Sequence, residues 1–142
     1  MASAKTLETF PCSAEKFYSI IVDYERYPEF LPEVKKCKIL KNENGKKLVE
    51  FEVSLVKSFK YRLWMTEVAG KSIHWTLESG EVFKTSSGSW VLEPQGDAVQ
   101  VQYEVDATFS LFVPGPIAKA LVSVNLPMMM KNYRDRVKKL FG

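Results

Sequence analysis

Residues that could carry out acid–base or nucleophilic chemistry are few in this sequence. Its one histidine, His74, alternates with Thr76 and Glu78 on the polar side of a strand-like segment. A histidine on such a face is far more often solvated than catalytic. The serines within residues 87–89 have no general base beside them in the sequence. The sequence therefore predicts no catalytic residue.

Motifs that bind phosphates, activate a serine or hold a metal are also missing. The chain contains no GxSxG, GxGxxG, phosphate-loop or HExxH pattern. Its carboxylates are spread over outward-facing strand positions, which gives neither an acid–base pair nor a metal-ligand set. Cys12 and Cys37 lack CxxC spacing and are expected to be free thiols. We expect no metal and no resident cofactor.

The composition is that of a water-soluble globular protein. Hydrophobic residues make up 46% of the 142 residues and charged residues 26%, which fits one domain over residues 1–142. The first residues lead directly into a strand-like pattern without a secretory signal, and no run of 18 apolar residues occurs. We expect a cytoplasmic protein, and a peripheral contact with the inner face of the membrane is left open.

Two stretches are rich in basic residues, although the net charge is only +3. Residues 33–47 hold six lysines against two glutamates, and residues 131–139 hold five basic residues against one aspartate. Such runs are usually solvated, but they can also contact an anionic surface such as a membrane or ribosomal RNA. The candidate contact residues are Lys35, Lys36, Lys38, Lys131, Arg134 and Lys138.

The first part of the chain predicts one strand and two short helices. Residues 3–10 alternate as a strand that Pro11 ends, and Ser13 is a helix N-cap residue. The helix is expected to reach about Asp23. An aromatic segment with two prolines, residues 24–32, follows and predicts a second, short helix.

The middle of the chain alternates with a period of two and predicts an antiparallel sheet of about six to seven strands. Asn44-Gly45 is a strong hairpin signal, and residues 99–109 give the most regular alternation. Apolar residues at helical spacing then run from Ile117 to Leu140. The predicted fold class is α+β: a curved antiparallel sheet, two short helices after the first strand, and a long C-terminal helix over an apolar cavity.

The dry face of this sheet supplies the predicted cavity, although such residues commonly form only a core. A single helix leaves part of a twisted sheet uncovered, and ligand pockets span about 300–1,000 Å³. An empty space of about 400 Å³ would cost about 10 kcal/mol, so we expect it to be filled. The predicted lining is Phe51, Val53, Tyr61, Leu63, Trp75, Leu77, Trp90, Leu92, Tyr103, Val105, Ile117, Leu121, Val124 and Met128. The strand register leaves open whether Leu63 or Trp64 faces inward.

The predicted entrance consists of four residues: Tyr27, Phe30, Leu31 and Pro127. Pro127 interrupts the apolar helical pattern, and a proline inside a helix frees the carbonyl four residues earlier, that of Ser123. It is either a static kink or break, or a hinge beside the flexible run Met128–Met130.

Several segments resemble the Coq10/RatA-like branch of the START-like (polyketide cyclase/dehydrase, Bet v 1-like, SRPBCC) superfamily. They are residues 27–32 after residues 13–18, then residues 88–94, and finally residues 130–137, in matching order over nearly the whole chain. The resemblance implies the helix-grip fold. Members bind ubiquinone or other prenyl lipids in support of respiration, a bacterial branch is described as toxins that block ribosomal subunit association, and wider relatives are aromatase/cyclases. Pro127, Met128–Met130 and Tyr133 depart from the usual pattern.

Three functions therefore remain as hypotheses. The first is non-catalytic transport or chaperoning of a hydrophobic ligand such as ubiquinone or another prenyl lipid, with the quinone or lipid as the bound molecule. The second is a ribosome-associating protein that uses the six basic residues. The third is a cyclase, for which Tyr61, Tyr103 and Arg62 are the candidate polar groups. The lack of a mitochondrial presequence favours a bacterial protein, and the oligomeric state is left open.

Overall fold

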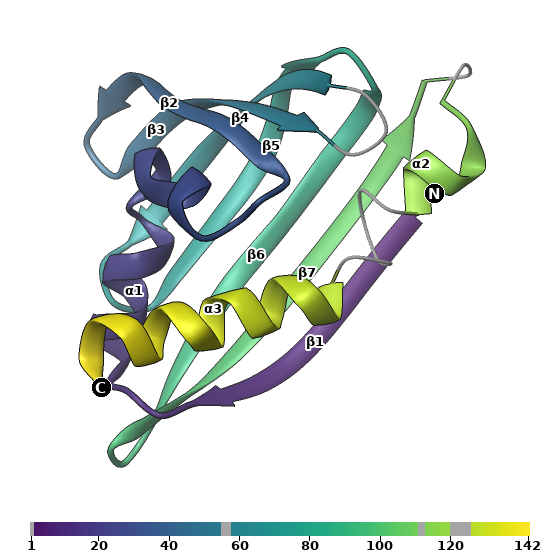
Figure 1. The fold of residues 1–142 in the computed structure, drawn as a ribbon. Coiled ribbons are helices and arrows are strands. Elements are labelled where there is room, and N and C mark those ends of the chain that lie inside the picture. Colours follow the sequence, from purple (N-terminus) through teal and green to yellow (C-terminus); the bar gives the residue numbers. More distant parts are fainter. Residues whose placement is uncertain (1, 55–57, 111–112, 120–125) are drawn as a thin grey trace.

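In the structure, a computed structural model, residues 2–54, 58–110, 113–119 and 126–142 are described. Within them an antiparallel sheet of seven strands has the order β1-β7-β6-β5-β4-β3-β2. The strands are β1 Ala2–Phe10, β2 Val34–Glu43, β3 Lys46–Ser54, β4 Ser58–Val68, β5 Ser72–Gly80, β6 Phe83–Gln95 and β7 Ala98–Phe109. Successive strands from β2 to β7 are neighbours, and β1 pairs with β7 (Figure 1).

Local sequence explains why the chain turns where it does. Ser13 caps helix α1, Ala14–Ile21, because its side-chain oxygen accepts a hydrogen bond from the backbone N–H of Lys16 at 3.2 Å. The next segment forms a 3-10 helix, η1, over Tyr24–Glu29. The Asn44-Gly45 hairpin joins β2 to β3, and Gly45 has a φ of +72°, which glycine adopts without strain.

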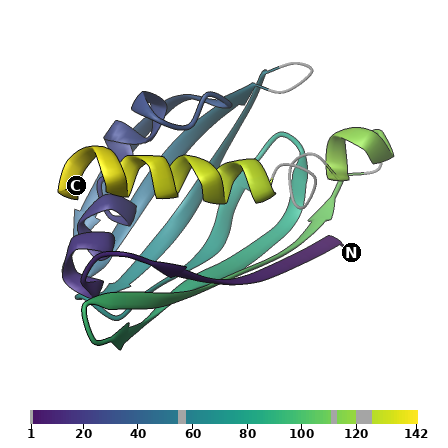
Figure 2. The ribbon, with the colours of Figure 1, turned by 60° about the horizontal axis from the view of Figure 1, so that its bottom comes forward.

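The helix α3, Leu126–Phe141, lies in the hollow of the curved sheet (Figures 1 and 2). A short helix, α2, covers Gly115–Lys119. The curved sheet, the two short helices after β1 and the C-terminal helix confirm the predicted fold class. No helix in the described ranges is both long and apolar enough to cross a membrane.

The two faces of the sheet are clearly distinguished by their side chains. Leu63 is 7% exposed and points to the concave face, whereas Trp64 lies on the outer face, with Lys46 Nζ 4.8 Å from its ring centroid. The register that the sequence left open is therefore the one with Leu63 inside. His74 is exposed on the outer face, as its alternation predicts.

Two parts of the C-terminal helical pattern are described in the structure, α2 and α3. The described part of α3 starts with Leu126, so Pro127 is its second described residue. The predicted hinge depends also on residues 120–125, which include Ser123 and lie outside the described residues. Leu121 and Val124, predicted to line the cavity, lie there too, and the side chain of Ile117 is likewise not described.

Candidate functional site

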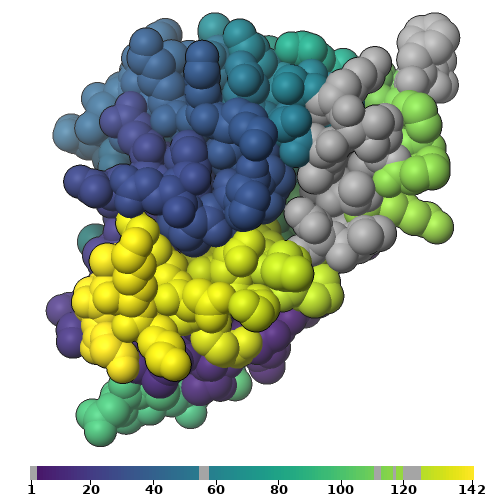
Figure 3. Space-filling model, in the orientation of Figure 1, coloured from purple at the N-terminus to yellow at the C-terminus, as the bar shows by residue number. Residues whose placement is uncertain are grey.

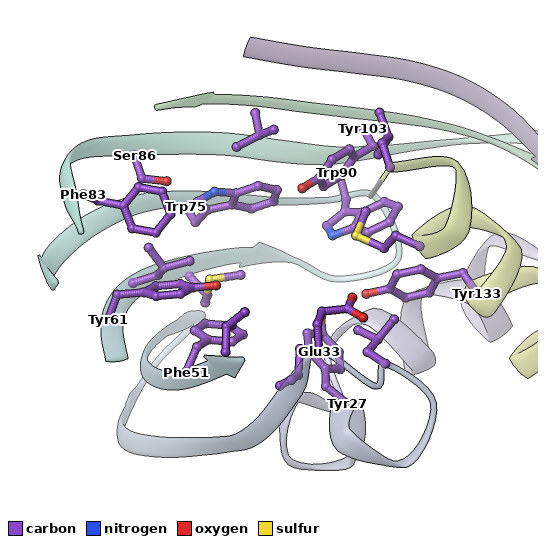
Figure 4. Close-up of a pocket in the computed structure, with 18 residues that line it drawn as sticks. Tyr27, Glu33, Phe51, Tyr61, Trp75, Phe83, Ser86, Trp90, Tyr103 and Tyr133 are labelled. Carbon is purple, nitrogen blue, oxygen red and sulfur yellow. The ribbon is translucent and has the colours of Figure 1, made fainter. Parts of the chain in front are cut away.

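A cavity of about 170 Å³ lies between the concave face of the sheet and α3. Its wall is mostly aromatic and aliphatic, with a few polar groups among them (Figure 4). The lining residues are Tyr27, Leu31, Glu33, Val34, Phe51, Val53, Tyr61, Leu63, Met65, Trp75, Phe83, Ser86, Trp90, Tyr103, Val105, Leu126, Met129 and Tyr133. The cavity is smaller than the pocket expected from the sequence, because large aromatic side chains fill much of the space.

Alternation along the strands places most of the predicted strand residues on this wall. They are Phe51, Val53, Tyr61, Leu63, Trp75, Trp90, Tyr103 and Val105, together with Tyr27 and Leu31 from the predicted entrance. Sequence reasoning missed Glu33, Val34, Met65, Phe83, Ser86, Leu126, Met129 and Tyr133. Met65 shares the inward alternation of Tyr61 and Leu63, so the period-two pattern could have included it.

Other predicted residues lie away from the cavity. Leu92 is buried in the filled part of the core, opposite Val101, and Leu77 packs against the core without reaching the cavity. Met128 was predicted to line the cavity but is 55% exposed. The buried positions of α3 include Met130, Tyr133 and Val137, and this spacing turns Met128 toward solvent.

Two residues predicted at the entrance also lie elsewhere. Pro127 is exposed at the start of α3. Phe30 borders a second depression instead of the cavity, together with Ser19, Ile20, Asp23, Arg136, Leu140 and Phe141. Phe30 packs edge-on against Tyr133, with ring centroids 5.1 Å apart, so it supports the wall of the cavity from behind.

Aromatic contacts hold the cavity wall in place. The rings of Phe51 and Tyr61 stack at 5.3 Å, and Tyr103 contacts both Trp90 at 4.7 Å and Trp75 at 5.8 Å. Tyr133 on α3 contacts Trp90 at 5.0 Å. Each such pair stabilises the fold by about 0.5–1.5 kcal/mol beyond its buried area. The wall therefore consists of rings that are held in place by contacts with one another.

The tyrosine hydroxyls of the wall can donate or accept hydrogen bonds, but their pKa values are too high for a general base at neutral pH. Burial raises the pKa of the hydroxyls of Tyr61, Tyr103 and Tyr133 well above their usual value. The nearby carboxylate of Glu33 raises those of Tyr61 and Tyr133 further, because it repels a phenolate. At neutral pH the three hydroxyls are protonated and can orient a ligand. Arg62, a candidate polar group for a cyclase, points to the outer face and pairs with Glu50 at 2.9 Å.

The described side chains do not form a metal site. In the parts of the chain that the structure describes, no three His, Cys, Asp or Glu residues come together as a metal site. Cys12 and Cys37 are free and buried, and burial raises the pKa of both thiols.

A polar contact fastens η1 to α3 beside the cavity. Arg136 is 7% exposed, donates a hydrogen bond to Glu29 at 2.9 Å and lies over the ring of Phe30 at 5.0 Å. The space-filling view shows α3 and the segment from η1 to β2 in contact over this face (Figure 3). The contact therefore ties α3 to the segment that precedes β2.

The contact between Arg136 and Glu29 makes the stability of the fold depend on pH in the acid range. The hydrogen bond from Arg136, supported by the positive charges of Arg136, Arg26 and Lys139, holds the pKa of Glu29 below its ordinary value of 4.5. The stability that ionised Glu29 contributes is thus fully present above pH 4.5 and is lost as the pH falls through the lowered pKa.

We expect Glu29→Gln to be less stable than the wild type at pH 7, and the difference in the free energy of unfolding to shrink at pH 3.5. Urea unfolding at both pH values measures this; Glu93→Gln, an exposed carboxylate on β6, is the control. An equal difference at both pH values would contradict the expectation.

The six basic residues predicted to form an anionic-surface contact are divided between two sides of the sheet. Lys36 and Lys38 lie opposite Glu52 and Glu50 on the outer face, and Lys35 is the extra residue of a bulge. The other three are carried by α3 in the hollow of the sheet. Of these, Lys131 pairs with Asp135 and Arg134 with Glu8, each at 2.8 Å, and Lys138 is exposed.

Comparisons with known proteins agree with this architecture. Residues 10–134 match the family described as polyketide cyclase / dehydrase and lipid transport. A START superfamily protein from Mycobacterium smegmatis superposes with a TM-score of 0.85 at 28% identity, over 97% of this chain and 98% of that one. The Zhui aromatase/cyclase from a Streptomyces species gives a TM-score of 0.85 at 14% identity, over 97% and 94% of the two chains, a likeness of fold alone.

Two relatives carry names that refer to toxins. The ribosome association toxin RatA of Pseudomonas aeruginosa is 29% identical over 139 residues, which is 93% of this chain and 92% of that protein. The persistence and stress-resistance toxin PasT of Escherichia coli is 32% identical over 104 residues, 70% of this chain. That alignment spans 64% of the length of PasT.

Proposed function

This chain belongs to the polyketide cyclase/dehydrase and lipid transport family, and from its cavity we propose that it binds a hydrophobic ring-bearing molecule without transforming it. A prenyl quinone such as ubiquinone, or another prenyl lipid, is the proposed ligand, and its transport or chaperoning in support of respiration is the proposed role. The observation that carries the proposal is the aromatic wall of the cavity. The wall offers aromatic rings and protonated hydroxyls, and among the described residues Glu33 is its one carboxylate and has no basic partner.

The size of the cavity bears on which part of such a ligand it holds. A cavity of about 150 Å³ binds benzene in another protein, so 170 Å³ accommodates a single ring. Left empty, this volume would cost about 4 kcal/mol at roughly 24 cal/mol per Å³. A ring that fills it recovers much of that cost. We propose that the ring occupies the cavity and that a prenyl tail extends beyond it.

Native mass spectrometry of the freshly purified protein, followed by solvent extraction, tests this proposal. We expect a bound hydrophobic molecule at near-equal stoichiometry, or uptake of a short-chain quinone or quinol by the apo protein. A mass equal to that of the bare chain, unchanged after incubation with such compounds, would overturn the proposal.

One observation favours a second candidate function, association with the ribosome. The similarity to the toxin RatA of Pseudomonas aeruginosa covers nearly the whole chain. The basic residues of α3 and β2 are the proposed contacts, and contacts with RNA phosphates weaken with salt. Salt-sensitive cosedimentation with ribosomal subunits is the expected result for this candidate. Absence of cosedimentation at low salt would exclude it.

A further inference from the structure

Glu33 is the one carboxylate among the described residues that line the cavity. It stands directly before β2, and its backbone carbonyl accepts a hydrogen bond from the N–H of Ser54 at 2.8 Å, which fixes its position. The carboxylate points into the cavity toward the hydroxyl of Tyr133 (Figure 4). An acidic side chain in an otherwise aromatic and aliphatic wall calls for a physical reason.

Several carboxylates of the protein pair with a cation, whereas that of Glu33 pairs with none among the described residues. Glu29 pairs with Arg136, Glu50 with Arg62 and Glu67 with Lys47. Within the described ranges, no cation and no hydrogen-bond donor contacts the carboxylate of Glu33. Glu33 is only partly buried, so solvent can reach its carboxylate while the cavity is open. A ligand that fills the cavity shields the carboxylate from solvent, and an unpaired charge enclosed among apolar groups is costly. We therefore expect the ligand itself to supply a hydrogen-bond partner.

The chemistry of that partner follows from what a carboxylate can do. An ionised carboxylate only accepts hydrogen bonds, and it repels the lone pairs of a carbonyl or ether oxygen. The hydroxyls of Tyr61, Tyr103 and Tyr133 already supply donors for acceptor atoms (Figure 4). Glu33 adds the complementary function, an acceptor for an O–H group on the ligand.

We propose that Glu33 determines ligand specificity by selecting rings that carry a hydroxyl group, such as phenols and hydroquinones, over rings with only carbonyl or ether oxygens. The inference rests on the proposed binding of a ring in this cavity. It adds that, of a quinone and its reduced form, the reduced form binds more tightly. A hydrogen bond to a charged group changes affinity by about 10- to 100-fold, which sets the expected preference.

A matched pair of redox-stable probes tests this inference. 4-Octylphenol and 4-octylanisole share the ring and the chain and differ in whether the oxygen carries hydrogen or methyl. Their dissociation constants are measured at pH 7 by quenching of tryptophan fluorescence, since Trp75 and Trp90 line the cavity. For the wild type we expect the phenol to bind about 10- to 100-fold more tightly.

Two variants and one control complete the experiment. Glu33→Gln keeps the shape of the side chain but removes its charge, and we expect the preference for the phenol over the anisole to fall to a few-fold or less. Glu33→Asp keeps the charge one methylene further back, and we expect an intermediate preference. Glu43→Gln, an exposed carboxylate at the end of β2, is expected to keep the full preference. Equal binding of both probes by the wild type, or a preference that neither Glu33 variant alters, would overturn the role of Glu33 and leave the proposed function standing. Failure of both probes to bind the wild type would overturn both.

Discussion

Val105→Trp is expected to abolish ring binding while the protein stays folded. Val105 lines the cavity from β7, so a larger side chain at this position extends into the cavity. The indole therefore enters the cavity and occupies the place of the ligand ring. Burying a ring contributes about 3 kcal/mol, so affinity should fall on the order of 100-fold. Titration of 4-octylphenol, followed by tryptophan fluorescence, measures the loss.

A second valine-to-tryptophan substitution on the neighbouring strand serves as the control. Val91 on β6 is 40% exposed and points to the outer face, so Val91→Trp adds the same indole outside the cavity. We expect it to bind the phenol as the wild type does. If Val105→Trp binds as tightly as Val91→Trp, the ligand does not occupy this cavity.

Gly88→Ala is expected to destabilise the fold more than any other single methyl group added at a glycine of this chain. A Cβ atom at Gly88 would overlap the indole ring of Trp75 and come within 2.5 Å of the backbone oxygen of Glu104. The backbone oxygen cannot rotate away, so the strands must shift. Such overpacking costs about 3 kcal/mol, measured as the free energy of unfolding in urea.

The chain offers a matched control for this substitution. Gly115 has open space around the position of a Cβ atom and no positive φ, so Gly115→Ala should change the stability by less than about 0.5 kcal/mol. Similar losses for the two variants would show that Gly88 and Trp75 do not have the close contact described above.

The sequence predicted the sheet-borne half of the site because strand alternation depends only on adjacent residues. Once Leu63 faces inward, Tyr61 and Met65 must do the same, and each neighbouring strand follows its own alternation. Register alone was ambiguous at Trp64, because tryptophan is apolar enough for either face. Its place outside, under Lys46, depends on the pairing with β3, which a single strand does not specify.

The helical and irregular half could not be predicted with the same reliability. The choice between Met128 and Met129 depends on the rotation of α3, which the neighbouring run of three methionines does not specify. Glu33 stands between a proline and the first residue of a strand, where an acidic residue normally indicates a solvated loop. Only the packing of η1 and α3 around it turns this carboxylate toward the interior.

The pairing of β1 with β7 bears on how the protein folds. Ala2 lies opposite Ala107 and Phe10 opposite Val99, so this strand pair joins segments that are far apart in the chain. Hairpins from β2 to β7 can form from local contacts, but β1 must wait for β7 to be synthesised. Closing such a long loop is entropically costly and slows folding. We expect refolding on the millisecond-to-second scale, with an open sheet that β1 completes late. Because no described residue of β1 lines the cavity, the ring site can be assembled before this last strand pairs.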